Sequence, residues 1–280
     1  MAAIILSTLF PSGTVTANYQ FAQNQTYIID SEFTLSGTNT FNSGSILIFQ
    51  GGCFKGSSSN PAVLVFNGCK IEGSGTIFKG NYISISTSSS VTNRLYNTAL
   101  LAEWFGVKPY SGDVTDAINK AIAACYASNV HNLLFSSGGF TVNGTVHVGQ
   151  TTTGAVDYNT RYWDIKLFGT GNYLGRGTSF NLGASGCFVV DMINRNLGSH
   201  RSGGIHECAF YGTETRETSG ILIKRATTYE LHKCSFFRLD KGSSCMVLVI
   251  MWIFAPACLI IVTMESKALM ILSTARRIII

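Results

Sequence analysis

Two histidines recur at one position of a repeated segment, and their type and spacing are the first sign of chemistry in the chain. Residues 205–211 read Ile-His-Glu-Cys-Ala-Phe-Tyr and residues 231–237 read Leu-His-Lys-Cys-Ser-Phe-Phe, so His206 matches His232. We call these two segments the histidine repeat. Imidazole groups bind metals and transfer protons near neutral pH. Recurrence at one place in a repeat is explained more simply by stacking of adjacent repeats, so we expect a structural ladder.

The histidine repeat places other reactive side chains in pairs. Cys208 recurs as Cys234, and Glu207 is replaced in the second segment by Lys233. We expect the two thiols to form an inward ladder, and the carboxylate and the ammonium group to form a solvated pair across the repeats. None of the eight cysteines forms a CxxC pair, so buried free thiols are favoured over disulfides, and neither a metal site nor a cofactor is expected.

The composition indicates the elements that hold these side chains. Charged residues make up 12% of the chain, which has 29 Gly and only 4 Pro, and Ser, Thr and Asn separate short apolar runs. This mixture predicts many short strands joined by turns. The net charge of +5 is modest and no Lys/Arg cluster stands out, which argues against nucleic-acid binding.

Internal similarity is the most informative feature of the sequence. Besides the histidine repeat, three pairs of segments are alike: 46–53 and 63–69, 54–56 and 78–80, and 186–190 and 220–224. The first pair aligns Ile46 with Val63. A short unit of two or three strands cannot bury its apolar face alone, whereas stacked units can. The repeats therefore predict a solenoid in which like residues lie above one another.

One segment, residues 113–127, breaks the strand pattern and predicts a helix. Asp113 or Thr115 is suited to cap its first turn, and Ser128-Asn129 is suited to end it. The following apolar and small residues fall on one face at helical spacing: Ala117, Ile118, Ala121, Ile122 and Cys125.

Strands are expected on both sides of this helix. After it, the apolar runs predict strands at 132–135, 140–142 and 145–148. At the start of the chain, residues 4–10 are apolar and end at Pro11, which predicts a first strand. The same stretch lacks a basic n-region, so it is a poor signal peptide.

The region around the helix carries a resemblance. Residues 102–106 (Ala-Glu-Trp-Phe-Gly), 113–122 and 133–142 follow one another as in the opening of pectate-lyase-like β-helix proteins, which include phage tailspikes and bacterial polysaccharide-processing proteins. The resemblance spans roughly 27–242. It implies an all-β fold, a right-handed parallel β-helix with one short packing helix near 113–127. Two turns depart from the family pattern, at 111–116 and 136–139.

The resemblance also implies a function. It indicates a protein that binds a polysaccharide or cell-surface glycan and, if it is an enzyme, a glycoside hydrolase or polysaccharide lyase. An extracellular, cell-surface or virion location follows, and a homotrimer follows if the tailspike resemblance holds. The alternatives are a non-catalytic structural or adhesive solenoid and a protein anchored in a membrane by its carboxy-terminal region.

Catalytic residues stay unknown at this point. No Asn-Thr-Asp, Asp-Asp or Gly-His-Gly set accompanies the acids of the repeat region, which are Asp191, Glu207, Glu214, Glu217, Glu230 and Asp240. Aromatic side chains in turn-rich polar sequence are the candidate carbohydrate contacts: Tyr162, Trp163 and Tyr173. Trp104 and Phe105 are expected in the core. Residues 169–175 resemble a phosphate loop, but no helix is expected after them, so a turn between strands is favoured.

The last part of the chain differs from the rest. We divide the sequence into a strand-rich lead-in with short repeats (1–100), the start of the β-helix (101–242) and an anomalous tail (243–280). Residues 245–264 carry no charge and are long enough to span a bilayer. In another reading frame, however, the codons of this tail force Gly and Val-Asp at places that suit a further repeat. We therefore expect an out-of-frame translation from about residue 243.

Overall fold

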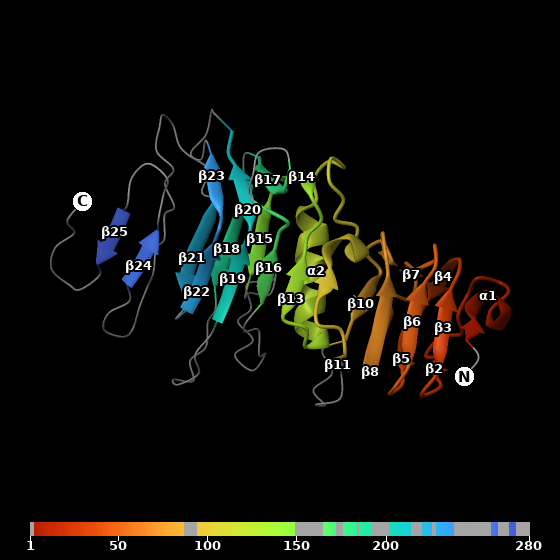
Figure 1. Cartoon of the computed structure of the whole chain (residues 1–280). Coiled ribbons are helices and arrows are strands. Elements are labelled where there is room, and N and C mark those ends of the chain that lie inside the picture. Colours follow the sequence, from red (N-terminus) through yellow and green to blue (C-terminus); the bar gives the residue numbers. More distant parts are fainter. Residues whose placement is uncertain are drawn as a thin grey trace.

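The structure is a computed structural model, and it describes residues 3–86, 94–148, 165–171, 176–183, 185–191, 202–213, 220–225, 228–237, 259–262 and 269–272. Short strands lie side by side along the length of an elongated molecule (Figure 1), and almost all of them pair in parallel. The described residues include two α-helices, and neither is long and apolar enough to cross a membrane. The expectation of a strand-rich chain with parallel sheets is therefore confirmed.

The first part of the chain forms two sheets. One has the strand order β1-β3-β6-β8-β5-β2, with β10 and β11 also paired to β8, and the other has the order β4-β7-β9. Their strands are β1 (Ile4–Ile5), β2 (Gln20–Phe21), β3 (Thr26–Ile29), β4 (Glu32–Leu35), β5 (Gly37–Phe41), β6 (Ile46–Phe49), β7 (Cys53–Gly56), β8 (Ala62–Gly73), β9 (Phe78–Lys79), β10 (Ile83–Ile85) and β11 (Arg94–Leu95).

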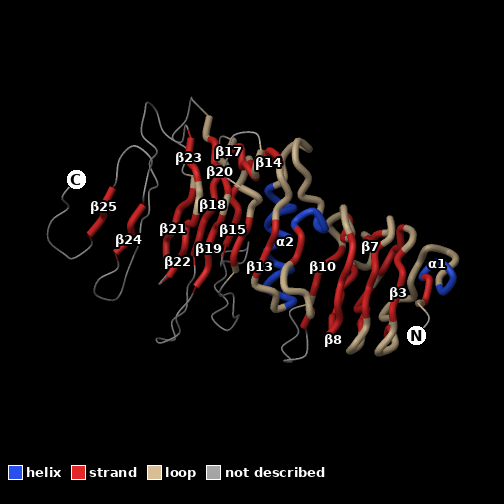
Figure 2. The backbone as a smooth tube through the Cα atoms, viewed as in Figure 1, coloured by secondary structure: helices blue, strands red, loops and turns tan. Residues whose placement is uncertain are grey.

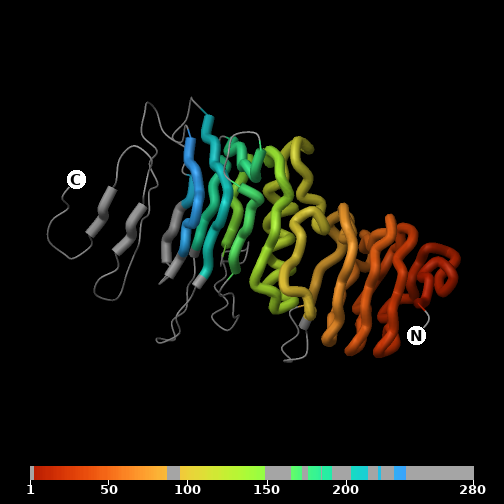
Figure 3. Tube along the Cα trace, in the orientation of Figure 1, coloured from red at the N-terminus to blue at the C-terminus, as the bar shows by residue number. Residues whose placement is uncertain are grey.

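The later part forms three parallel sheets, with the orders β12-β13-β16-β19-β22, β14-β17-β20-β23 and β15-β18-β21. Each successive chain segment adds one strand to each sheet, as Figure 3 shows by its colour sequence. The strands are β12 (Leu100–Leu101), β13 (Asn132–Leu134), β14 (Gly138–Val142), β15 (Thr145–Val148), β16 (Lys166–Phe168), β17 (Thr178–Leu182), β18 (Cys187–Asp191), β19 (Ser202–His206), β20 (Cys208–Tyr211), β21 (Ile221–Arg225), β22 (Thr228–His232) and β23 (Ser235–Phe237).

Ladders of phenylalanine rings fill the interior of both parts. Phe180 is fully buried, and its ring centroid lies 5.8 Å from that of Phe140 and 5.4 Å from that of Phe210. In the first part the ring of Phe41 stacks between Phe21 and Phe66, at 4.2 and 5.3 Å. Offset-stacked rings gain beyond the apolar area that they bury. Like residues therefore lie above one another, as the repeats predict.

The predicted helix is confirmed as α2 (Thr115–Ser128), which is labelled in Figure 2. The carboxylate of Asp113 accepts the backbone N–H and the hydroxyl of Thr115, so it satisfies one of the free donors of the first turn. Asn129 ends the helix in the left-handed conformation, with φ of 56°. On the predicted face, Ala117 is half-buried and the other four residues are buried.

The prediction of one strand over residues 4–10 is wrong. Only β1 is extended, and α1 (Leu6–Leu9) follows it. The pairing with β3 stops after Ile5, which pairs with Ile28. The carboxylate of Asp30 instead accepts the backbone N–H and the hydroxyl of Ser7, while Leu6 is buried.

The similarity of 46–53 with 63–69 does not reflect strand pairing. Ile46 pairs with Lys70, and Val63 pairs with Thr38, in different registers and with different partners. Every half-buried strand alternates apolar and polar residues, so two strands can look alike without being neighbours. The similarity of 54–56 with 78–80 does reflect pairing, because β7 and β9 are partners.

The similarity of 186–190 with 220–224 identifies the right pair of strands in the wrong register. It aligns Cys187 with Ile221, whereas Ile221 pairs with Phe188. Side chains alternate between the two faces of a strand, so a slip by a single position exchanges its inner and outer sets. Phe188 and Ile221 are both buried, which is why the observed register is the stable one.

The tail is described only in two strands, β24 (Leu259–Val262) and β25 (Leu269–Leu272), which pair antiparallel. The remaining positions from 243 onward lie outside the described residues. The membrane anchor and the out-of-frame translation therefore both stay predictions.

Candidate functional site

The predicted carbohydrate contacts Tyr162, Trp163 and Tyr173 lie outside the described residues. Trp104 and Phe105 belong to the 3₁₀-helix η1 (Ala102–Phe105) and are buried, so the prediction of a core position is confirmed. The indole N–H of Trp104 donates to the Gly73 carbonyl at 2.9 Å, which satisfies its one polar group.

The histidine ladder is confirmed. His206 pairs with Phe168 on one side and with His232 on the other, in the sheet that contains β16, β19 and β22. The His206 ring stacks on Phe168 with a centroid distance of 4.6 Å and lies 5.8 Å from His232. Its side chain belongs to the outer face of the sheet, because the alternate residue Ile205 is in the core.

His206 is only 7% exposed, and its surroundings favour the neutral ring. Burial lowers its pKa, with a further lowering by Lys166 and His232 that Glu230 and Glu207 oppose. Its Nε2 has no hydrogen-bond partner among the described residues, and Glu230 Oε2 is 3.9 Å away, beyond hydrogen-bond distance. A ring so covered fits a structural role better than contact with a substrate.

Two further pairs of side chains, close to His206 and His232 in the sequence, have the predicted arrangement. Lys233 Nζ lies 3.5 Å from Glu207 Oε1, and both side chains are exposed. Cys208 and Cys234 are both free, the first buried and the second half-buried. Burial raises the pKa of the Cys208 thiol and raises that of Cys234 to about 11, so both remain protonated and unreactive near neutral pH.

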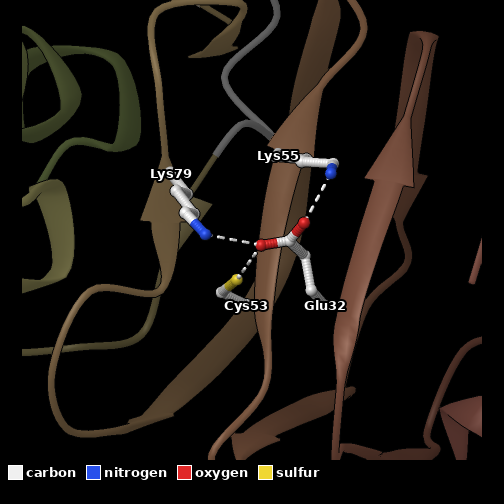
Figure 4. Close-up of polar contacts among 4 residues, drawn as sticks. All are labelled: Glu32, Cys53, Lys55 and Lys79. Carbon is white, nitrogen blue, oxygen red and sulfur yellow. Dashed lines mark hydrogen bonds and ion pairs between the residues drawn. The ribbon is translucent and has the colours of Figure 1, made fainter.

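A charged cluster lies on the outside of the β4-β7-β9 sheet (Figure 4). The Glu32 carboxylate accepts from Lys55 on β7 and from Lys79 on β9, the latter at 2.7 Å, and the Cys53 thiol lies 3.7 Å from it. The hydrogen bonds from Lys55 and Lys79 lower the pKa of Glu32 to about 2. One carboxylate thus bridges two ammonium groups, and the cluster ties three strands together with a net charge of +1.

The four strands of the β14-β17-β20-β23 sheet, in contrast, contain no charged residue. The inward residues are Phe140, Phe180, Phe210 and Phe236, so the alternate residues point outward. We define the outer platform as these outward residues together with Tyr110: Tyr110, Gly139, Thr141, Ser179, Asn181, Ala209, Tyr211, Ser235 and Phe237. Gly139 and Ala209 are buried among the larger members.

Tyr110 begins the outer platform. It is 80% exposed and has a left-handed backbone conformation, with φ of 59°, which is uncommon for a residue with a side chain. Its backbone N–H donates to the Gly139 carbonyl at 2.8 Å, which holds it beside β14. A Cβ atom on Gly139 would lie 3.2 Å from Tyr110 Cε1, so the absence of a side chain there lets the ring approach the sheet.

Tyr211 and Phe237 form the other aromatic part of the outer platform. They are partners on β20 and β23, with ring centroids 4.8 Å apart and planes inclined by only 11°. Both are half-buried, and the Tyr211 hydroxyl is buried without a hydrogen-bond partner among the described residues. A left-handed backbone and an exposed aromatic ring, as at Tyr110, are both common at functional sites.

These aromatic residues were missed from the sequence. The signal for Tyr211 and Phe237 is their match across the histidine repeat, next to the inward Phe210 and Phe236. Tyr110 has no such signal, because it lies in a connection between η1 and α2 and reaches the sheet only through the tertiary structure.

Within the described part of the chain, no group of three His, Cys, Asp or Glu side chains lies close enough to hold a metal ion. No family model matches the chain, and no curated protein or solved structure matches it. The functional assignment therefore depends on the outer platform itself and on the resemblance of residues 102–142.

Proposed function

We propose that this chain is a right-handed parallel β-helix that binds a polysaccharide on its outer platform. The single observation that carries the proposal is the exposed Tyr110, held in a left-handed conformation on the same face as the Tyr211–Phe237 pair. The resemblance of residues 102–142 to pectate-lyase-like proteins supports the same fold and the same class of ligand.

The fold supports the proposal because successive segments add one strand to each of three parallel sheets. Such a scaffold is stiff and repeats itself at the strand spacing, about 4.8 Å. That spacing is close to the length of one pyranose unit. A polymer of repeated sugars is therefore a natural match for a surface that repeats at the same interval.

The chemistry of the outer platform also fits a sugar. Pyranose rings have one face of C–H groups, which packs against aromatic rings, and a rim of hydroxyl groups, which needs hydrogen-bond donors and acceptors. Tyr110 and Tyr211 provide the first and Asn181 the second. Asn181 is exposed, and its amide makes no side-chain hydrogen bond within the described residues.

The proposal is for binding and not for cleavage. Glycoside hydrolases need two carboxyl groups that face one bond. Among the described acids beside the later strands, Glu207 contacts Lys233 and Asp113 accepts from Thr115. Glu230 lies 3.9 Å from His206, and Asp191 ends β18 in another sheet. An adhesive or receptor-binding solenoid at a cell or virion surface is the corresponding biological role, and a homotrimer accompanies it if the tailspike resemblance holds.

The test is affinity electrophoresis of the full chain through gels that contain single polysaccharides, with Tyr110→Ala, Tyr211→Ala and the double variant. We expect retardation by at least one polysaccharide, with each single substitution weakening binding roughly 10-fold, the loss typical of one aromatic contact. Tyr96→Ala is the matched control, because Tyr96 is 60% exposed but lies beside β8 in the first part of the chain. Equal retardation of all variants would place binding elsewhere.

A further inference from the structure

We infer that His206 and Glu230 form a pH-sensitive contact between β19 and β22, in which the protonated imidazole donates from Nε2 to the carboxylate. The inference is independent of the outer platform, because it concerns a different sheet. It starts from a buried imidazole nitrogen that has no hydrogen-bond partner among the described residues, although a carboxylate oxygen lies 3.9 Å away.

A glycine makes room for this imidazole. Gly204 lies two residues before His206 on β19, so both belong to the outer face of the sheet. A Cβ atom on Gly204 would lie 2.5 Å from His206 Nε2 and 3.3 Å from the Cβ atom of Glu230. The imidazole nitrogen therefore occupies the space that a side chain at position 204 would fill, beside β22.

The row of residues that contains Gly204 places opposite charges on the two sides of this nitrogen. Lys166 pairs with Gly204 from β16, and Glu230 pairs with it from β22. Lys166 is half-buried, whereas the side chain of Glu230 is 54% exposed. Exposed side chains change rotamer readily, so the carboxylate is the group that can move toward Nε2.

The titratable groups that act on His206 come from all three neighbouring strands or their ends. Burial lowers the pKa of His206 most, and among the charged neighbours Glu230 has the largest effect and raises it. Lys166 and His232 lower this pKa, and Glu207 raises it by a smaller amount. Glu230 is therefore the main group that favours a protonated ring.

Protonation strengthens the contact between the two side chains. It places a proton on Nε2 and a positive charge on the ring, and a hydrogen bond between charged groups is shorter and stronger than one between neutral groups. Exposed carboxylates remain ionised at pH 5.5, so the charged pair forms in the acidic range and is absent at pH 8. Since burial still opposes protonation, the contact limits the loss of stability in acid and does not reverse it.

An NMR titration of the histidines in the full chain tests the contact, with the His206 signal identified by its absence in His206→Phe. We expect the pKa of His206 to fall further in Glu230→Gln, because the carboxylate no longer favours the charged ring, and to rise in Lys166→Gln, because a repelling charge is removed. Glu72→Gln is the matched control, since Glu72 is a partly exposed carboxylate on β8 in the first part. The same pKa of His206 in the wild type and in Glu230→Gln would overturn the inference.

Hydrogen exchange tests whether the contact joins the two strands. At pH 5.5 we expect the amides of β22 to exchange roughly 3-fold faster in Glu230→Gln than in the wild type, the size typical of one partly exposed ion pair. At pH 8 the two proteins should exchange alike. Equal acceleration at both pH values would mean that Glu230 stabilises β22 without the proton on His206, and no acceleration at either would mean that the strands are not joined in this way. Both results count against the inference.

Discussion

The two parts of the chain stack their strands in the same way but space them differently in the sequence. In the first part Thr26 pairs with Ile46, and Ile46 pairs in turn with Lys70. In the later part Thr145 pairs with Cys187, which lies much farther along the chain from its partner. The strands of the later part are no longer than those of the first part, so the added residues lie between strands. Connections of this kind are where binding residues concentrate on a rigid scaffold.

The outer surfaces of the two parts also differ. In the first part the outward Glu32 pairs with Lys55 and Lys79. In the later part, Tyr110 and Asn181 are exposed and the latter makes no side-chain hydrogen bond within the described residues. Similar internal packing is therefore compatible with outer surfaces of different chemistry.

The largest expected effect is the loss of stability when a buried phenylalanine ring is removed. It tests whether the interiors of the two parts contribute equally to stability. Phe41→Ala and Phe180→Ala each remove a fully buried ring from a ladder, so each is expected to cost about 3–5 kcal/mol of unfolding free energy. Hydrogen exchange of each variant should show the loss of protection concentrated in its own part, because repeats interact mainly with their neighbours. Tyr82→Ala, at a 49% exposed position, is the control. Equal loss throughout both variants would mean that the two parts unfold as one unit.

A smaller effect is expected between pH 5 and pH 8, from His206 in the later part. Burial lowers the pKa of His206 in the folded state, so the unfolded chain binds more protons as the pH falls below about 6.5. The stability that the neutral ring contributes is present above that value and is lost as the pH falls through the lowered pKa. Chemical denaturation at pH 5 and pH 8 measures the difference.

His206→Phe is expected to reduce this pH dependence. A phenyl ring continues the stack on Phe168 and cannot be protonated. His232→Phe is the comparison, because His232 is exposed. An unchanged pH dependence in His206→Phe would show that other groups cause it.

The smallest effect is expected at the charged cluster of the first part. Glu32→Gln removes the ion pairs with Lys55 and Lys79, which are solvent-exposed and therefore contribute little to stability. Since the pKa of Glu32 is lowered from 4.5 to about 2, this stabilisation is present above pH 4.5 and is lost as the pH falls toward 2. Thermal unfolding at pH 7 and pH 3 should differ less in Glu32→Gln than in the wild type, and a loss above about 2 kcal/mol at pH 7 would indicate a larger role than exposed ion pairs have.

Much of the local structure was determined by the sequence itself. The helix ends at Asn129 because asparagine tolerates the left-handed conformation that closes a helix. The histidine repeat places His206 beside His232 and Phe210 beside Phe236, because both segments have the same alternation of inward and outward residues. These patterns involve residues that are close together in the sequence. Helix capping and side-chain alternation are therefore sufficient to predict them.

Only the tertiary structure decided which strands are neighbours and which side chains share a face. Ile46 pairs with Lys70 although Val63 lies in the more similar segment, because alternation is common to all strands and pairing depends on how the chain closes around its core. For the same reason Tyr110 and Tyr211, far apart in the sequence, lie on one outer face. Nothing in either local segment specifies this, since it results from the stacking of β14, β17 and β20 next to Tyr110.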